Sequence, residues 1–166
     1  MSIIKVNEIQ NVAGTQNKGV LQVVSATKVD VFTTSSATMV DITGLTVTLT
    51  PRSTDSKVLI LSQCQTSVDT NGYESRIQLV RAISGGATTN IAINTDTTRK
   101  NSMSQITTNN YEMSHVSAFH LDSPSTTSAI TYHLEASSDA TICINRKGNN
   151  TDLGGTSNIT AMEIQG

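Results

Sequence analysis

Strict alternation between aliphatic and polar residues is the feature that most limits what this chain can fold into. Leu45, Val47 and Leu49 alternate with threonines, and the same period of two returns at 130–135 and 141–145. Successive side chains of a strand point to opposite faces, so the pattern predicts half-exposed β-strands. Threonine suits an outer face, because its branched Cβ favours extended backbone while its hydroxyl meets water. No stretch combines a helical period with capping residues, and we predict an all-β fold.

The composition agrees with a folded, polar-surfaced chain. Of its 166 residues, 26 are Thr, 20 are Ser and 13 are Asn, whereas charged residues reach only 14% and the net charge is −2. Disordered chains combine high net charge with few β-branched residues, so disorder is not expected. A chain of this length can bury one substantial core, and we expect a soluble domain.

About ten short strands follow from the pattern. Residues 58–61 are aliphatic on both faces, which predicts a strand in the centre of its sheet. Residues 95–112 are the least regular stretch and are expected to hold at most one edge strand. The predicted strands are 21–32, 37–42, 45–50, 57–66, 74–83, 89–94, 113–121, 130–135, 141–145 and 159–164.

Turn residues separate these strands. Asp69-Thr70-Asn71-Gly72 predicts a hairpin, since Asn-Gly accepts positive φ, and Ser84-Gly85-Gly86 predicts a second one. Ten strands at this spacing indicate an antiparallel, jelly-roll-like β-sandwich, which we place at residues 20–166.

The first 19 residues differ from the rest and are predicted to form a short N-terminal docking arm and hinge. Ile3, Ile4, Val6 and Ile9 are the residues expected to dock on a neighbouring protein. The alternatives are a first strand or a frayed terminus.

Catalytic, cofactor and metal sites are not predicted. His115 and His120 fall on opposite faces of one strand, and His133 shares its outward face with Glu135, short of the three or four ligands of a metal site. The aspartates lie mostly in turns, where they bond their own backbone. No Gly-x-Ser-x-Gly elbow or phosphate-binding loop occurs, and we predict a protein that is not an enzyme and has no cofactor.

The sequence also argues against nucleic acid and membranes as partners. There is no basic cluster for nucleic acid, and no apolar run long enough to span a membrane. Cys64 and Cys143 fit no metal spacing; they either pair with each other or, as we favour, remain buried free thiols.

Several segments together resemble a family. They are Phe-His-Leu-Asp-Ser-Pro at 119–124, Ser-Ala-Ile-Thr-Tyr-His-Leu at 128–134, Ile-Cys-Ile-Asn-Arg at 142–146, Ser-Asn-Ile-Thr-Ala-Met-Glu-Ile at 157–164 and Ile-Lys-Val-Asn-Glu-Ile at 4–9. The chain resembles virion structural proteins of marine tailed phages, tail-fibre or capsid-decoration proteins. The resemblance implies a jelly-roll head related to tumour-necrosis-factor-like domains, usually a homotrimer, and it carries no catalytic residues.

The function expected from this resemblance is structural. Only about twenty residues precede the sandwich, which favours a capsid decoration or head-fibre subunit on the virion surface, made in the host cytoplasm. Its partners would be its own copies and a major capsid or tail protein. The alternatives are a tail-fibre or receptor-binding tip and a glycan-binding or glycan-degrading protein, with host surface glycan as the partner. The loop residues expected to make such contacts are Asn71, Gly72, Tyr73, Gly85, Gly86, Asn149 and Asn150.

Overall fold

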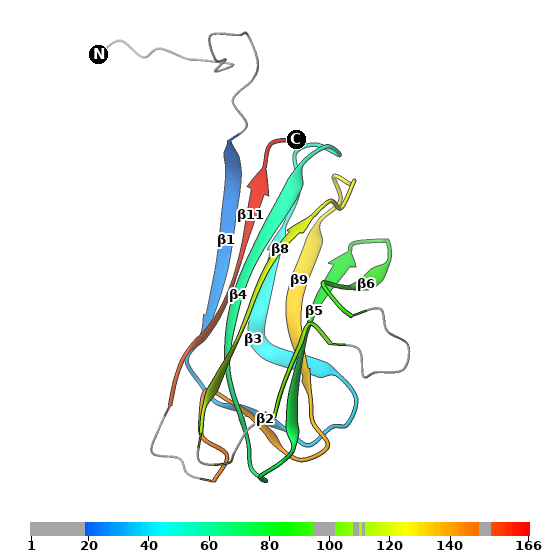
Figure 1. Ribbon diagram of the computed structural model, residues 1–166. Coiled ribbons are helices and arrows are strands. Elements are labelled where there is room, and N and C mark those ends of the chain that lie inside the picture. Colours follow the sequence, from blue (N-terminus) through cyan, green and yellow to red (C-terminus); the bar gives the residue numbers. More distant parts are fainter. Residues whose placement is uncertain (1–18, 95–101, 108–109, 111, 150–153) are drawn as a thin grey trace, which may run out of the picture.

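Eleven strands form the described part of the chain in a computed structural model (Figure 1). The structure describes residues 19–94, 102–107, 110, 112–149 and 154–166. The strands are β1 (Val20–Lys28), β2 (Phe32–Thr34), β3 (Val40–Leu49), β4 (Lys57–Val68), β5 (Glu74–Ile83), β6 (Thr88–Ile91), β7 (Ser104–Thr107), β8 (Ser114–Asp122), β9 (Ile130–Ser137), β10 (Ile142–Ile144) and β11 (Ser157–Ile164).

Two antiparallel sheets pack face to face. The first, here called the β4 sheet, has the order β1-β11-β4-β10-β2, with β8 also paired to β4. The second, the β5 sheet, has the order β3-β9-β5-β6, with β7 also paired to β5. The expected all-β sandwich is confirmed, as is the central position of β4, which is paired with β8, β10 and β11.

The core lies between the sheets and is made from alternate residues of each strand. Along β4 as far as Thr66, and along all of β11, every second side chain is buried, so the period of two in the sequence is the period of burial. The largest wholly buried apolar side chains are Ile42, Leu45, Ile60, Ile77, Leu79, Ile130, Tyr132, Leu134, Ile142, Ile144 and Ile159.

One predicted strand is divided in two. Residues 21–32 were expected to run unbroken, but β1 ends at Lys28 and β2 begins at Phe32. The chain changes partner here, from β11 to β10. The buried amide of Asn145 donates to the carbonyls of Lys28 and Asp30, at 2.9 and 3.0 Å, and so satisfies backbone groups that leave the ladder.

The prediction of a hairpin at Asp69–Gly72 is wrong, whereas the prediction of a hairpin at Ser84–Gly86 is confirmed. Gly72 has φ +83°, as the turn requires, but β4 and β5 belong to different sheets. The turn therefore carries the chain across the sandwich. After Ser84–Gly86 the chain returns at once, because β5 pairs with β6. Among the described residues, no helix is long and apolar enough to cross a membrane.

Candidate functional site

Part of the outer face of the β4 sheet is apolar, which is unusual for a sheet exposed to water. Leu59 and Leu61 alternate with the buried residues of β4 and therefore point outward. On β8, Leu121 lies opposite Leu59, and Phe119 opposite Leu61. Aliphatic and aromatic side chains of neighbouring strands thus meet on one surface.

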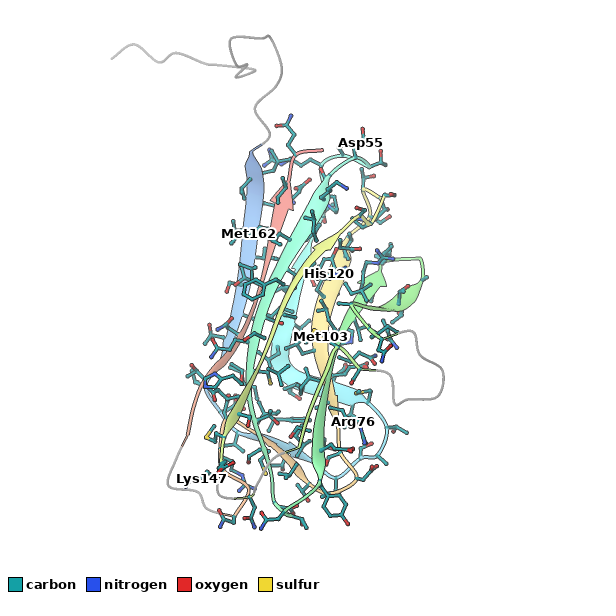
Figure 2. The ribbon with its side chains drawn as sticks, viewed as in Figure 1. Asp55, Arg76, Met103, His120, Lys147 and Met162 are labelled. Carbon is teal, nitrogen blue, oxygen red and sulfur yellow. The ribbon has the colours of Figure 1, made fainter. Side chains whose placement is uncertain are left out.

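Two further strands extend this surface. Met162 of β11 lies opposite Leu59 and beside Val23 of β1, and Ile164 pairs with Val20 (Met162 is labelled in Figure 2). Phe119 is 79% exposed, and Val20, Val23 and Leu121 are each more than half exposed. We call this set the apolar face: Val20, Val23, Leu59, Leu61, Phe119, Leu121, Met162 and Ile164.

Polar groups border the apolar face. Toward the other end of the sheet, the amides of Gln63 and Gln65 contact the imidazole of His115 at 3.1 Å. Lys57 is the one lysine or arginine at an outward position on β1, β4, β8 and β11, and its ammonium donates to Ser123 at 3.0 Å. Soluble monomers rarely leave a contiguous apolar surface of this kind in water, so it is typical of a protein–protein interface.

The outer face of the β5 sheet is polar along β3 and β9 by contrast. Thr48 and Thr131 form a cross-strand hydroxyl pair at 2.9 Å, next to Thr46 and His133. On β3 and β9 the outward positions are therefore mostly polar, whereas β4 has leucine at two of its outward positions. The two faces differ enough to give the sandwich one side suited to packing.

The chain enters the sandwich at one end of the apolar face. Val20 begins β1, and the amide of Gln165 donates to the carbonyl of Gly19 at 2.9 Å, so both ends of the sandwich-forming segment lie together (Figure 1). The predicted docking residues Ile3, Ile4, Val6 and Ile9 lie outside the described residues.

A buried carboxylate supports this end of the sandwich. Glu163 is fully buried and accepts from the Gln22 amide at 2.6 Å and from the Arg52 backbone at 2.7 Å. Burial alone would raise its pKa, but the hydrogen bonds from Arg52 and Gln22 outweigh burial and hold the pKa below its usual value of 4.5.

We expect the Glu163 carboxylate to make stability fall in acid. Its pKa is lower in the folded than in the unfolded chain, so its contribution is present above the unfolded pKa and is lost as pH falls through the folded pKa. Urea unfolding from about pH 6 to about pH 3 measures this slope. The Glu163→Gln variant should have a shallower slope; an unchanged slope would contradict the assignment.

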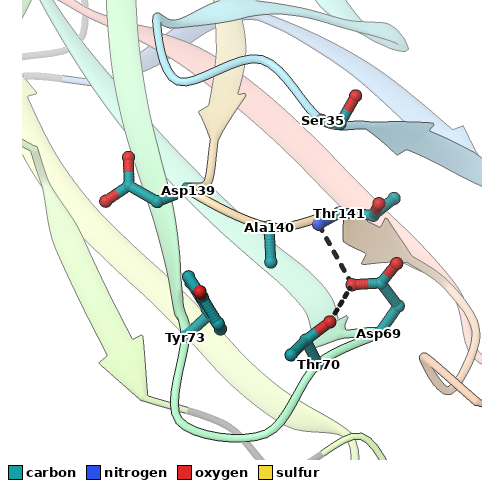
Figure 3. Close-up of a pocket in the computed structure, with 7 residues that line it drawn as sticks. All are labelled: Ser35, Asp69, Thr70, Tyr73, Asp139, Ala140 and Thr141. Carbon is teal, nitrogen blue, oxygen red and sulfur yellow. Dashed lines mark hydrogen bonds between the residues drawn. The ribbon is translucent and has the colours of Figure 1, made fainter.

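A polar pocket of about 280 Å³ (Figure 3) lies at the end of the sandwich opposite to the chain termini (Figure 1). It is lined by residues from the loops after β2, β4 and β9. Tyr73, which is 41% exposed, supplies its one aromatic ring. The lining residues are Ser35, Asp69, Thr70, Tyr73, Asp139, Ala140 and Thr141.

Both carboxylates of the pocket are already held by hydrogen bonds. Asp69 accepts from the Thr141 backbone and the Thr70 hydroxyl, both at 3.1 Å, and Asp139 accepts from the buried Arg76 at 3.1 and 3.2 Å. Burial raises the pKa of Asp69, but the Thr141 and Thr70 bonds outweigh it and leave the pKa below 3.8. Asp69 is therefore ionised at neutral pH, which suits binding hydroxyl groups rather than donating a proton.

The predicted contact loops separate into two groups. Asn71 and Asn149 lie close together, because both bond Asn110: its amide donates to the Asn71 side chain at 2.8 Å, and its carbonyl accepts from Asn149 at 3.2 Å. Gly72 and Tyr73 follow Asn71, whereas Asn150 lies outside the described residues. Gly85 and Gly86 follow the far end of β5, about 30 Å away along a ten-residue strand. One contact surface cannot include both groups.

A third cluster lies on the outer face of the β5 sheet. Nε2 of His133 is 3.3 Å from Oδ1 of Asp41 and 3.6 Å from Oε1 of Glu135. The sequence places His133 and Glu135 on one face but does not place Asp41 beside them. The thiols of Cys64 and Cys143 are buried and form no disulfide, as we predicted from the sequence. Burial raises the pKa of Cys64 to about 12.

Comparison with known proteins yields structural similarity alone. No protein-family model and no curated protein matches the sequence. Solved structures of infectious bursal disease virus do match: the Gx strain at 9% identity and a TM-score of 0.46, and the VP2 subviral particle at 10% and 0.44. A mutant VP2 protein in derived particles has 10% identity and a TM-score of 0.47.

These matches cover 96–99% of this chain but only 40–46% of the solved chains, so it spans less than half their length. Similarity at this level says nothing about what the chain binds.

Proposed function

We propose that this chain is a non-enzymatic virion structural protein, a capsid decoration or head-fibre subunit that self-assembles through its apolar face. The observation that carries the proposal is the contiguous apolar surface on β1, β4, β8 and β11 of a sandwich whose other face is polar. A structural subunit needs a packing surface of this kind, and the sequence resemblance to virion proteins supports the same function.

A second copy of this chain is the partner that suits the apolar face best. The face has no charge at its centre, so it offers no complementary potential to a charged foreign surface. Its aliphatic and aromatic side chains are typical of subunit interfaces, which resemble a core cut in half. The resemblance implies three copies around one axis, and we propose a homotrimer.

The two ends of the sandwich would then have separate roles. The N-terminal segment leaves at the end formed by Val20 and Ile164, and the pocket with Tyr73 lies at the other end. We propose that Ile3, Ile4, Val6 and Ile9 attach the subunit to the shell or tail, which leaves the far loops facing away from the particle.

Loss of the N-terminal residues tests attachment. A variant without residues 2–12 should keep its strands and its oligomeric mass but no longer bind purified particles that lack the protein. A second test variant is the full-length chain with Ile3, Ile4, Val6 and Ile9 replaced by serine, which keeps the segment length and should also fail to bind. Saturation of the particles by either variant would overturn the arm proposal.

A receptor-binding tip is the second candidate, and the pocket is the observation that favours it. Its hydroxyls, ionised Asp69 and exposed Tyr73 ring provide the bonding and stacking groups that a sugar needs. Tyr73→Ala should then reduce adsorption of the protein to host cells at least tenfold. Thr88→Ala, at the hairpin on the other end of β5, should not. Equal adsorption by both variants, or none by the unmodified protein, would contradict this candidate.

A further inference from the structure

We propose that Asp41, His133 and Glu135 form a binding site for one Zn²⁺ ion on the outer face of the β5 sheet. Two strands supply the ligands, Asp41 from β3 and the other two from β9. One ligand atom from each residue lies within 4.8 Å of the other two. The site is independent of the assembly proposed above, since it lies on the opposite side of the sandwich.

The two distances from His133 to the carboxylate oxygens suit zinc. With Zn–N and Zn–O bonds of about 2.1 Å, ligands at neighbouring corners of a tetrahedron lie about 3.4 Å apart. Nε2 of His133 lies 3.3 Å from Oδ1 of Asp41 and 3.6 Å from Oε1 of Glu135. Three protein ligands leave the fourth position for water, as in open zinc sites.

Irregular pairing of β3 is what brings Asp41 to this position. Asp41 lies opposite Glu135, and Thr46 lies opposite His133. Between these two pairs β3 advances by five residues while β9 advances by only two. Ile42 and Leu45 point into the core within this irregular stretch, and Gly44 has φ +90°. The extra residues are thereby accommodated, and the Asp41 carboxylate stays on the outer face beside the imidazole.

A buried amide orients the second carboxylate. Gln78 of β5 is 3% exposed, and its Nε2 donates to Oε2 of Glu135 at 3.1 Å. This bond leaves Oε1, the other oxygen of Glu135, on the side of His133. Hydrogen bonds of this type hold a metal ligand in position before the metal binds.

The donor set selects the kind of ion. Hard cations such as Ca²⁺ and Mg²⁺ take oxygen ligands, whereas imidazole suits Zn²⁺ and similar transition metals. The His133 side chain is only 13% exposed, so the imidazole is held in place, while the exposed Asp41 side chain leaves an approach from solvent.

Titration with Zn²⁺ against a chromophoric chelator, using the full-length protein, tests the site. We expect one ion per chain, at least tenfold weaker binding for Asp41→Asn and no stoichiometric binding for His133→Gln. Co²⁺ should give visible absorption bands that both variants lose. His115→Gln, on the outer face of the other sheet, is the matched control and should bind as the unmodified protein does.

Two results would overturn the proposal. Binding that is no tighter in the unmodified protein than in His133→Gln would mean that the cluster is an ion pair alone. Binding within threefold of the unmodified protein for Asp41→Asn would mean that Asp41 is not a ligand. Circular dichroism of each variant separates loss of the site from loss of the fold, and neither result bears on the virion function.

Discussion

Replacing Asp122 with alanine should lower the free energy of unfolding by about 3–5 kcal/mol, the range found when one partner of a buried ion pair is removed. Asp122 ends β8, its side chain is 7% exposed, and its carboxylate accepts from Nη1 of Arg81 at 2.8 and 3.0 Å. Arg81 belongs to β5, so this ion pair joins the two sheets. Without Asp122 the guanidinium would lose its charged partner in a mostly buried position.

Tyr132 adds to the loss of stability expected for Asp122→Ala. Its hydroxyl donates to Oδ2 of Asp122 at 2.8 Å, and burial together with this carboxylate raises the pKa of the phenol. The alanine variant would therefore leave a buried hydroxyl unpaired as well.

Urea unfolding measures the Asp122 effect, with the exposed Asp55→Ala as control. The double variant Arg81→Met with Asp122→Ala should lose less than the sum of the two single losses, because it removes both charges. A loss of less than about 1 kcal/mol in the free energy of unfolding for Asp122→Ala would contradict the account, because exposed ion pairs contribute no more than that.

Replacing Phe119 or Leu61 with aspartate should convert the assembled protein to monomers. The two side chains face each other across β8 and β4 on the apolar face. Burial of a large apolar side chain contributes about 1.5–3 kcal/mol, and a charge at the same position would also have to lose its water. In a symmetric assembly each substitution acts once per subunit, which multiplies the effect.

Thr48→Asp is the matched control for these variants. Thr48 and Thr131 form the corresponding cross-strand pair on the outer face of the β5 sheet, so a charge there should leave assembly unchanged. Light scattering gives the mass of each variant. If Thr48→Asp and Phe119→Asp have the same mass, the apolar face is not the interface.

Alternation in the sequence predicts which residues are buried more reliably than it predicts which strands are neighbours. The strand at 74–83 and the hairpin at Ser84–Gly86 follow from local signals, and both are present. Asp69–Gly72 has the same local turn chemistry, but the sheet that each flanking strand joins depends on distant partners, β9 for β5 and β11 for β4.

The candidate surfaces depend on contacts that the sequence does not reveal. Leu59 and Leu61 are read in the sequence as residues of a central strand, and only their pairing with β8 and β11 brings Phe119 and Met162 beside them. Apolar residues at two successive outward positions on each of β4, β8 and β11 are the signal that could have revealed the apolar face. Asp41 joins His133 only through the irregular register of β3, for which the sequence offers Gly44 as its one indication.

The mass of the unmodified chain in solution tests the central claim most directly. One chain has a mass of 17.6 kDa, and the proposed homotrimer predicts three times that value by light scattering at micromolar concentration. A stable assembly whose mass falls to that of one chain in Phe119→Asp is the result we expect. A monomer of 17.6 kDa for the unmodified protein, with the apolar face left in water, would contradict the account.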